Sequence, residues 1–451
     1  HISIPVAEAR EFYPLSSAQK RLYILQQMEG SELSYNMPDA LVLKGDLDLE
    51  RLEAVFQQLI QRHETLRTSF EMIDGEVKQR IHQKVDFSLE YIEVNEELET
   101  AIDGFIRVFD LEKPPLLRVG VTTLKTGLNL LVLDMHHIIS DGFSMEILSA
   151  EFEALYSGQV ELTPLRIQYK DYAVWQQAEM QSERLKKQED YWLNIFSGEL
   201  PTLELPTDYE RPKVQSFEGN TLEFTVDSEL TASVQKLAEK YEITLYMFYL
   251  AAYSVLLAKH SAQEDIVIGV PIAGRTHSDL EPLIGMFVNT LAIRNYPFAE
   301  KSFEEFLLEV KERALEAHEN QEYPFEELVE KLDLKRDLSR NPLFDTMFDL
   351  QVEEEQNIQK NASLSVLPMY NDKVAKFDLL LNMSLERDEM KAEFQYCTKL
   401  FKKNRIDRLS KDLIMILSQI CQEPQIQLKN IKVNEAKKKR ENIVESVEFS
   451  F

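Results

Sequence analysis

Cysteine, glycine and long apolar runs are all scarce in this chain of 451 residues. Its two cysteines, Cys397 and Cys421, form no CxxC pair and imply no disulfide framework, which favours a reducing, cytoplasmic location. Only 13 glycines are present, so long flexible linkers are not expected. The longest apolar stretch, 245–258, is shorter than the ~20 residues that span a bilayer. The sequence therefore predicts a buried helix there and no membrane partner.

Basic residues are outnumbered by acidic ones, 50 to 78, which gives a formal net charge of −28. A surface this acidic repels phosphate backbones, so we expect no nucleic-acid partner. No signal-peptide pattern opens the chain. The chain starts at His1 rather than at a methionine and ends in a charged segment, so we expect both ends to be cut from a longer protein.

The chain is longer than the ~250–300 residues that one hydrophobic core usually serves, which predicts two lobes. Strand and helix patterns of similar size lie on both sides of a stretch that contains Pro201, Pro206 and Pro212. This similarity suggests a structural duplication, although no fixed-period repeat is visible. We expect an α/β lobe at 1–196, a linker at 197–215, a second α/β lobe at 216–433 and a tail at 434–451.

Apolar spacing and capping residues predict the elements around the most informative stretch, "LVLDMHHIISDGFSMEIL" (131–148). Residues 128–135 form a continuous apolar run, which predicts a strand buried on both faces. Residues 144–158 have helical spacing, with Ser144 as the N-cap and Gly158 as the stop. Similar reasoning predicts helices at 16–30, 48–67, 303–321 and 405–422 and a hairpin turn at Asp74-Gly75.

Two adjacent histidines, His136 and His137, end the predicted buried strand. Neighbouring side chains on a strand point to opposite faces, so the pair does not easily bind one metal ion, and no HExxH motif is present. We therefore expect no metal site. We interpret His136 as a core residue and His137 as the imidazole that faces a cleft, where it can take a proton from an amine or a hydroxyl.

The turn after the histidines adds a carboxylate, Asp141, and a residue without a side chain, Gly142. If Asp141 is buried it needs a cationic partner. Gly142 leaves a gap that can admit a narrow substrate arm. No GxSxG, Walker or dinucleotide-binding pattern competes with this site, and no nucleophilic serine or cysteine is visible beside it. The residues favour direct transfer onto a bound acceptor over a covalent enzyme intermediate.

The stretch "MHHIISDGFS" (135–144) resembles the HHxxxDG motif of condensation domains of nonribosomal peptide synthetases, which chloramphenicol acetyltransferase and related acyltransferases share. Six further stretches resemble the other motifs of that family, in order, so the resemblance covers about residues 13 to 430. They are "SSAQKRLYIL" (16–25), "RHETLRTSF" (62–70), "YKDYAVW" (169–175), "IGMFVNTLAIR" (284–294), "ENQEYPFEELV" (319–329) and "RDLSRNPLF" (336–344).

The resemblance implies an α/β fold of two chloramphenicol-acetyltransferase-like lobes in a V-shaped pseudo-dimer, with the active site in a tunnel between them. It implies amide-forming acyl transfer between two carrier proteins, an upstream donor and a downstream acceptor, with an adenylation domain adjacent in the same polypeptide. The substrates ride on phosphopantetheine arms, and the domain itself binds no cofactor.

The family motif also implies roles for individual residues. His137 is the catalytic histidine, either as general base or by positioning the amine, and His136 supports it. Asp141 is structural and pairs with an arginine, for which Arg67 and Arg294 are the candidates, and Gly142 borders the passage of the donor arm. The candidates for lining the tunnel are Ser144 and Asn289.

The subtype follows from the same resemblance. Both histidines are kept, which disfavours heterocyclisation, and "SSAQKRLYIL" resembles the type that joins two L-residues. A starter domain that uses a fatty acyl donor is an alternative. A noncatalytic condensation-like module that recruits other proteins is another.

Overall fold

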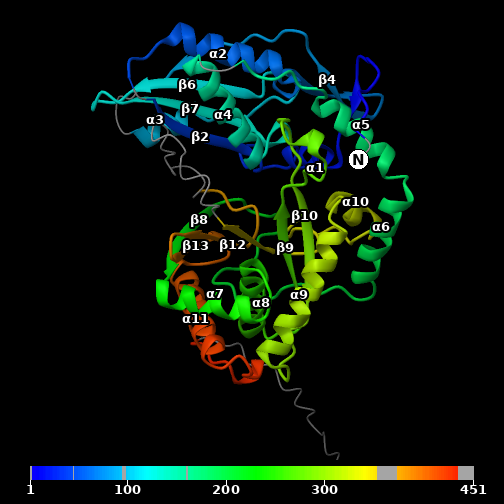
Figure 1. Cartoon of the computed structure of the whole chain (residues 1–451), viewed down its shortest axis with the longest axis vertical. Coiled ribbons are helices and arrows are strands. Elements are labelled where there is room, and N and C mark those ends of the chain that lie inside the picture. The colour runs from blue at the N-terminus through cyan, green and yellow to red at the C-terminus, as the bar shows by residue number, and fades with distance from the viewer. Residues whose placement is uncertain (1–2, 44, 94–97, 159–160, 353–372, 435–451) are drawn as a thin grey trace, which may run out of the picture.

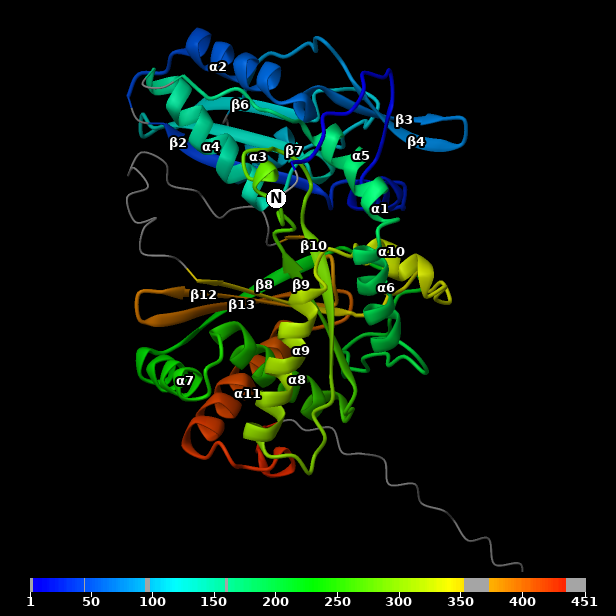
Figure 2. The same ribbon diagram turned by 45° about the vertical axis from the view of Figure 1, so that its right-hand side comes forward.

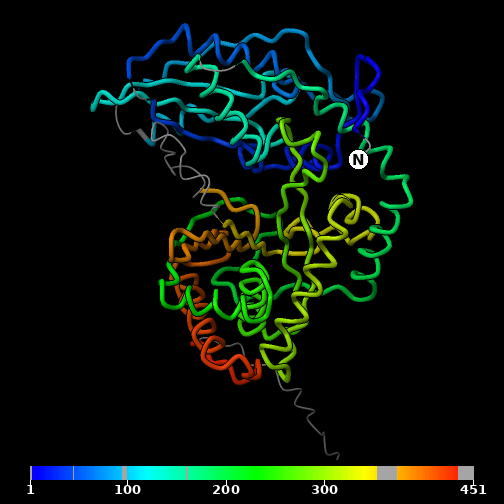
Figure 3. The backbone as a smooth tube through the Cα atoms, viewed as in Figure 1, coloured from blue at the N-terminus to red at the C-terminus, as the bar shows by residue number. Residues whose placement is uncertain are grey.

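Two lobes, one above the other in Figures 1 and 2, make up the part of the chain that the structure describes. The structure is a computed structural model and describes residues 3–43, 45–93, 98–158, 161–352 and 373–434. Beyond its first residue, the tail predicted at 434–451 lies outside the described residues. The backbone trace in Figure 3 shows that the chain builds most of the upper lobe first and the lower lobe afterwards.

The upper lobe is built on a four-stranded sheet, one of three sheets in the described part of the chain, with the strand order β2-β7-β6-β5. Every residue of its second strand, β7, is buried, as predicted from the apolar run. Because β7 lies between β2 and β6, its C-terminal end is held on both sides. The strands are β2 (Asn36–Leu43), β5 (Glu90–Tyr91), β6 (Leu117–Thr123) and β7 (Asn129–His136).

Helices cover both faces of this sheet (Figure 1). On one face, α2 (Leu49–Arg62) packs on α4 (Gly142–Ser157), and the Phe56 and Phe152 rings stack with centroids 5.1 Å apart. On the other face, α3 (Leu98–Phe105) packs beside Val132 of β7. The predicted helix 48–67 ends earlier, at Arg62, and continues as a short 3-10 turn.

The helix after the histidines starts two residues before the predicted cap. The Asp141 carboxylate accepts a hydrogen bond from the Ser144 N–H at 2.8 Å, so Asp141 is the N-cap of α4 and the prediction of Ser144 is wrong. Asp141 takes the cap because its backbone is extended while residues from Gly142 onward are already helical. Gly158 ends α4 in the left-handed conformation, with φ of 69°, as predicted.

The lower lobe is built on a six-stranded sheet with the order β10-β9-β11-β12-β13-β8. Its strands are β8 (Gly219–Val226), β9 (Ile266–Ile272), β10 (Asn289–Asn295), β11 (Thr346–Val352), β12 (Leu379–Glu386) and β13 (Glu389–Cys397). Below it in Figure 1 lie α7 (Ser228–Lys240), α8 (Leu245–Ser261), α9 (Phe303–Glu319) and α11 (Lys403–Gln422).

The apolar helix α8 is the centre of the lower core, because most of its residues are buried against the sheet and the other helices. No single helix among the described residues is long and apolar enough to cross a bilayer, and α7 with α8 reaches the required length and composition only as a pair bent by 110°.

A small third sheet, with the order β1-β4-β3, contains the predicted hairpin. Asp74 and Gly75 both have positive φ, 52° and 83°, which is the geometry of the tight turn expected there. The strands are β1 (Tyr13–Pro14), β3 (Thr68–Ile73) and β4 (Glu76–Ile81). Next to it, α1 (Ser17–Gln26) is capped by Ser16, as predicted, and α5 (Tyr169–Glu179) packs against β1.

Each lobe extends one segment into the other. The helix α6 (Glu183–Ile195) buries Leu185 and Trp192 in the core of the lower lobe, although it precedes the predicted linker. In the opposite direction, residues 273–288 between β9 and β10 reach the upper lobe, where Ile284 is buried in its core (Figure 1). The lobes are therefore joined by packed chain as well as by the linker.

Candidate active site

The two histidines lie at the C-terminal end of β7, where their backbone is held from both neighbouring strands. The His136 N–H donates to the Leu116 carbonyl at 3.0 Å, and the His137 N–H donates to the Tyr35 carbonyl at 2.8 Å. β7 ends at His136, and His137 opens a short 3-10 turn that leads to Asp141. This fixed turn gives the two rings different surroundings.

His136 is fully buried and both ring nitrogens are used. Its Nδ1 accepts the Ile138 N–H at 3.0 Å, so Nε2 carries the proton and donates to Gln26 Oε1 at 2.9 Å. Burial lowers the pKa of His136 to about 3, with a smaller contribution from His137. The burial of the ring confirms the prediction that His136 is a core residue. With this low pKa the ring is neutral at physiological pH.

His137 is only half-buried. Its Nδ1 is buried without a hydrogen-bond partner among the described residues, and interactions of the ring with the backbone of His137 and Ser140 act to raise its pKa. Burial, and next the charge of Lys376, lower the pKa of His137 to about 4, although the Asp141 carboxylate acts in the opposite direction. At neutral pH the ring is an uncharged imidazole that can accept a hydrogen bond from a substrate.

Asp141 is fully buried and joins the two lobes. Besides capping α4, its carboxylate accepts the Phe287 N–H at 2.9 Å and lies 3.4 Å from the Arg275 guanidinium. Arg275 also donates to the Ser144 hydroxyl at 2.8 Å. The buried carboxylate thus has the cationic partner that its burial requires, and that partner comes from the lower lobe.

The predicted partners of Asp141, Arg67 and Arg294, are therefore wrong. Arg67 donates to the backbone carbonyls of Ile60, Gln61 and His82. Arg294 forms an ion pair with Asp265 at 2.7 Å. Both arginines are held by neighbours in their own lobe, whereas Arg275 lies on the segment that crosses between lobes.

The other predicted site residues have distinct surroundings. At Gly142, an added Cβ would meet nothing within 4 Å, so open space lies beside this position. Ser144 is fully buried, and its hydroxyl donates to the Gly285 carbonyl at 2.8 Å, so it holds the lobes together and does not line an open passage. The Asn289 amide donates to the Gln321 and Tyr323 carbonyls at 2.9 and 3.0 Å.

Several of the motif stretches, far apart in sequence, meet where the lobes touch. The Ser16 and Tyr169 hydroxyls lie 2.7 Å apart, and the Tyr169 ring packs against Gly285, where an added Cβ would come within 2.0 Å of it. The Thr65 hydroxyl donates to the Ile284 carbonyl at 2.9 Å. These contacts join motif stretches of the upper lobe to one another and to the segment 273–288 that crosses from the lower lobe.

Sequence reasoning missed two charged residues near His137, Arg275 and Lys376. Arg275 follows Gly274, three residues after the end of β9, a position where a polar residue close to a strand end could have been noticed. Lys376 lies three residues before the start of β12, and no sequence pattern marks it. No group of three or more His, Cys, Asp or Glu side chains arranged to hold a metal ion is found among the described residues.

A family model for the condensation domain matches residues 9–442. The chain belongs to the condensation-domain family. Condensation domains of nonribosomal peptide synthetases catalyse amide-bond formation, and the predicted family and enzyme class are confirmed.

Among its relatives, this condensation domain is 49% identical over 435 residues to gramicidin S synthase 2 of Brevibacillus brevis. The alignment covers 96% of this chain and 10% of the relative. It is 49% identical over 439 residues to tyrocidine synthase 3 of Brevibacillus parabrevis, covering 97% of the chain and 7% of the relative. The chain thus spans a tenth or less of the length of these curated relatives.

Solved structures agree on the fold. The X-domain in its complex with OxyB from teicoplanin biosynthesis superposes with a TM-score of 0.89, at 26% identity, over 97% of this chain and 99% of that one. The mixed α/β architecture of the condensation domain is the two-lobed, chloramphenicol-acetyltransferase-like pseudo-dimer, and the predicted fold class is confirmed.

Proposed function

We propose that this domain forms a peptide bond between substrates held on two carrier proteins. The acceptor amine attacks the carbonyl of the donor thioester, the new C–N bond forms, the C–S bond breaks, and the thiol of the donor arm leaves with a proton. The peptide then stays on the acceptor arm. The observation that carries this proposal is a neutral, half-buried His137 in an intact HHxxxDG turn, held between two lobes.

The low pKa of His137, about 4, favours positioning over prior proton abstraction. An α-amino group has a pKa near ~8, so moving its proton completely to this ring before attack would cost about 5 kcal/mol. A hydrogen bond from the neutral amine to the imidazole has no such cost, and the ring can take the proton as the C–N bond forms and the nitrogen becomes acidic. Holding two tethered reactants together then supplies much of the acceleration.

We further propose the substrate class and the partners. The motif "SSAQKRLYIL" supports an L-configured aminoacyl or peptidyl donor. An upstream donor carrier and a downstream acceptor carrier deliver the substrates on phosphopantetheine arms, and an adenylation domain adjoins this domain in a longer, cytoplasmic polypeptide. The chain itself contributes no cofactor to the reaction. The relatives' length supports this multidomain setting.

The test supplies the chain with a donor carrier loaded with an L-aminoacyl thioester and an aminoacyl acceptor carrier, and follows dipeptidyl carrier by intact-protein mass spectrometry. We expect dipeptide on the acceptor carrier from the unaltered chain and almost none from His137→Ala. A D-aminoacyl donor and a fatty acyl donor, run in parallel, measure donor preference. Equal product from the altered and unaltered chains would overturn the assigned role of His137.

A recruitment module is the second candidate, because the X-domain with the same fold was solved in complex with another protein, OxyB. Under that alternative, both carriers bind but no dipeptide forms with any donor. The intact histidine turn favours catalysis over this alternative.

Gly142→Leu tests the passage of the donor arm. The substitution meets no neighbour within 4 Å of its Cβ and needs no unusual backbone conformation, so the fold should tolerate it. We expect dipeptide formation to fall while the melting temperature is kept. A variant that unfolds would instead show that Gly142 is needed for the structure.

A further inference from the structure

A lysine from the lower lobe lies beside the His137 turn of the upper lobe. The Lys376 ammonium is 5.0 Å from the centre of the Tyr35 ring, and the Tyr35 carbonyl is the one that accepts the His137 N–H. Lys376 is half-buried, and its ammonium has no acidic or hydrogen-bonding partner among the described residues. A cation is therefore held over the ring of Tyr35, the residue whose backbone carbonyl binds the candidate catalytic histidine.

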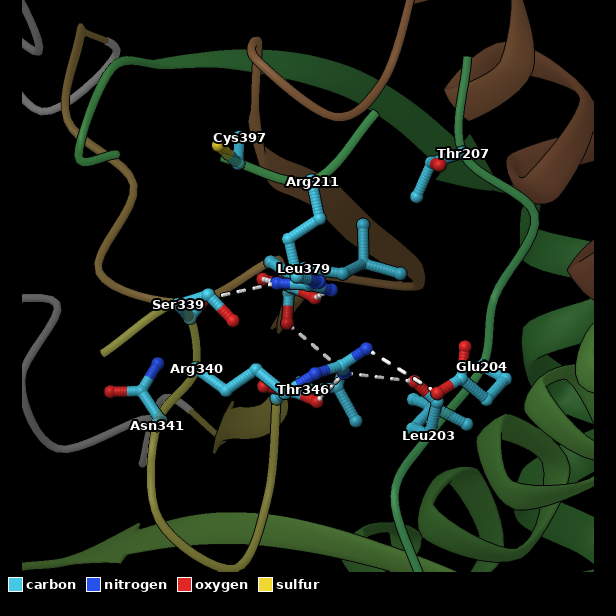
Figure 4. A network of polar contacts seen from close by, with 12 residues as sticks. Leu203, Glu204, Thr207, Arg211, Ser339, Arg340, Asn341, Thr346, Leu379 and Cys397 are labelled. Atoms are coloured by element: carbon cyan, nitrogen blue, oxygen red, sulfur yellow. Dashed lines mark hydrogen bonds and ion pairs between the residues drawn. The ribbon is translucent and has the colours of Figure 1, made fainter. Parts of the chain in front are cut away.

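The backbone of Lys376 is fixed by contacts from two remote segments. Its carbonyl accepts hydrogen bonds from the Gln215 amide at 2.9 Å and from the Asn341 amide at 3.0 Å. Two residues later, Asp378 forms an ion pair with Arg211. Arg211 also donates a hydrogen bond to the carbonyl of Ser339, which lies two residues before Asn341 in the loop 339–341 (Figure 4). A lysine anchored in this way is placed by the fold, unlike a surface lysine that moves freely.

The loop 339–341 also contacts the linker 197–215. Figure 4 shows Arg340 reaching toward Leu203 and Glu204, and its guanidinium donates to the Leu203 carbonyl at 3.3 Å and to Asp345 at 2.6 Å. The position of Lys376 therefore depends on the linker and on the loop 339–341, both outside the upper lobe that contains His137.

Among the charged and titratable groups around His137, Lys376 is the cation whose charge lowers the pKa of the ring. Two other groups lie in or beside the turn of His137. The negative charge of Asp141 is neutralised by Arg275, and the His136 ring is uncharged. Tyr35 faces it uncharged, because burial raises the pKa of Tyr35 to about 12 against the charge of Arg21 on α1. Burial lowers the pKa of Lys376 to about 8, so the amine still carries a proton for most of the time at pH 7.

We propose that Lys376 is a positioning residue whose ammonium, supplied by the lower lobe, acts together with burial to oppose protonation of the His137 imidazole, so that the ring can accept a hydrogen bond. A protonated ring has no acceptor nitrogen, and two adjacent cations repel each other. This inference rests on the proposed function for its consequence in catalysis, but the effect of one charge on the other can be measured without any substrate. The lower lobe would then contribute to the chemistry of a histidine in the upper lobe.

The experiment measures the pKa of His137 by NMR of the full chain with isotope-labelled histidine, with His137→Ala used to assign the signal. Lys376→Met removes the charge and keeps a chain that can cover Tyr35, and Lys376→Arg keeps the charge. Lys373→Met is the matched control, since it removes a charge three residues away that is exposed and paired with Glu99. Lys376→Gln replaces the methionine variant if that one does not fold.

We expect Lys376→Met to raise the pKa of His137 by about one unit, and Lys376→Arg and Lys373→Met to leave it nearly unchanged. The acid limb of the rate of dipeptide formation should move to higher pH by a similar amount. An unchanged His137 titration in Lys376→Met would overturn the proposal, even if activity fell. A raised pKa without dipeptide formation by the unaltered chain would support the coupling and count against the proposed function alone.

Discussion

The two histidines at the end of β7 differ in burial and in hydrogen bonding. On the side of His136 the ring is fully buried, bonded at both nitrogens and packed edge-on against Phe109 with centroids 6.1 Å apart. On the side of His137 the ring is half-buried, and its Nδ1 has no hydrogen-bond partner among the described residues. Adjacent positions in one motif thus separate a structural imidazole from one that is free to meet a substrate.

The comparison shows that protonation state alone does not distinguish the two roles. Burial lowers the pKa of both rings, to about 3 for His136 and about 4 for His137, so both are neutral at pH 7. They differ in the hydrogen bonds that remain to be made. Only a ring with an unused nitrogen can bind an incoming amine, and the structure provides this at His137.

Removing His137 should have the largest effect on activity and almost none on folding. We expect His137→Ala to slow dipeptide formation by about a thousandfold, with the free energy of unfolding changed by less than about 0.5 kcal/mol because the ring is half-buried and no described side chain hydrogen-bonds to it. His318→Ala, which replaces an exposed histidine, is the control. A large loss of stability in His137→Ala would place His137 with His136 as a structural residue.

Removing Asp141 should disturb the turn that separates the two rings. Asp141→Ala leaves Arg275 buried without its carboxylate and the Phe287 N–H without an acceptor, so we expect a loss of about 3 kcal/mol in urea unfolding. Asp110→Ala, which breaks the exposed pair with Lys113, should cost less than about 0.5 kcal/mol. Equal costs for the two variants would show that Asp141 is not an anchor between lobes.

Removing His136 should affect stability in a way that depends on pH. We expect His136→Ala to cost about 2 kcal/mol at pH 7.5, because it leaves a cavity, a Gln26 Oε1 without its donor and an Ile138 N–H without its acceptor. The folded pKa of His136, about 3, is below its unfolded value, so the unaltered protein loses stability as the pH falls from 6.5 toward 3. At pH 5 this loss is about 2 kcal/mol. The variant lacks it, so the two unfolding curves should nearly coincide at pH 5, and a constant difference would contradict the buried, neutral state.

The smallest expected effect is the absence of a histidine step in the pH profile. Because the pKa of His137 is about 4, its charge does not change between pH 5.5 and 8. Single-turnover rates should rise over this range with the titration of the acceptor amine near ~8. An inflection near ~6.5 would show that His137 titrates as an ordinary exposed imidazole.

Local structure around the site was predictable from sequence because it depends on neighbouring residues. The buried strand, the turn with Asp141 and Gly142, and the helix that ends at Gly158 all follow from apolar spacing and capping preferences. Sequence preference alone favours Ser144 as the cap, because serine is also a common capping residue. Only the backbone conformation shows that the helix begins earlier and that Asp141 fills this position.

The partner of Asp141 was not predictable in the same way. Arg275 is 134 positions away and reaches the carboxylate because residues 273–288 cross from the lower lobe to the upper lobe. Arg67 and Arg294 lie in motifs of the family, but their own lobes bind them first. A single sequence contains no measure of which arginine the packing of the lobes will bring close.

The sequence by itself determined the residue types of this site, their spacing on a strand, a turn and a helix, and through them the family. The tertiary structure decided which imidazole is sealed in the core, which arginine neutralises Asp141, and that Lys376 stands beside His137. The physical reason is that burial and charge act through space, so the ionisation and hydrogen bonding of a side chain depend on remote segments that the fold places around it.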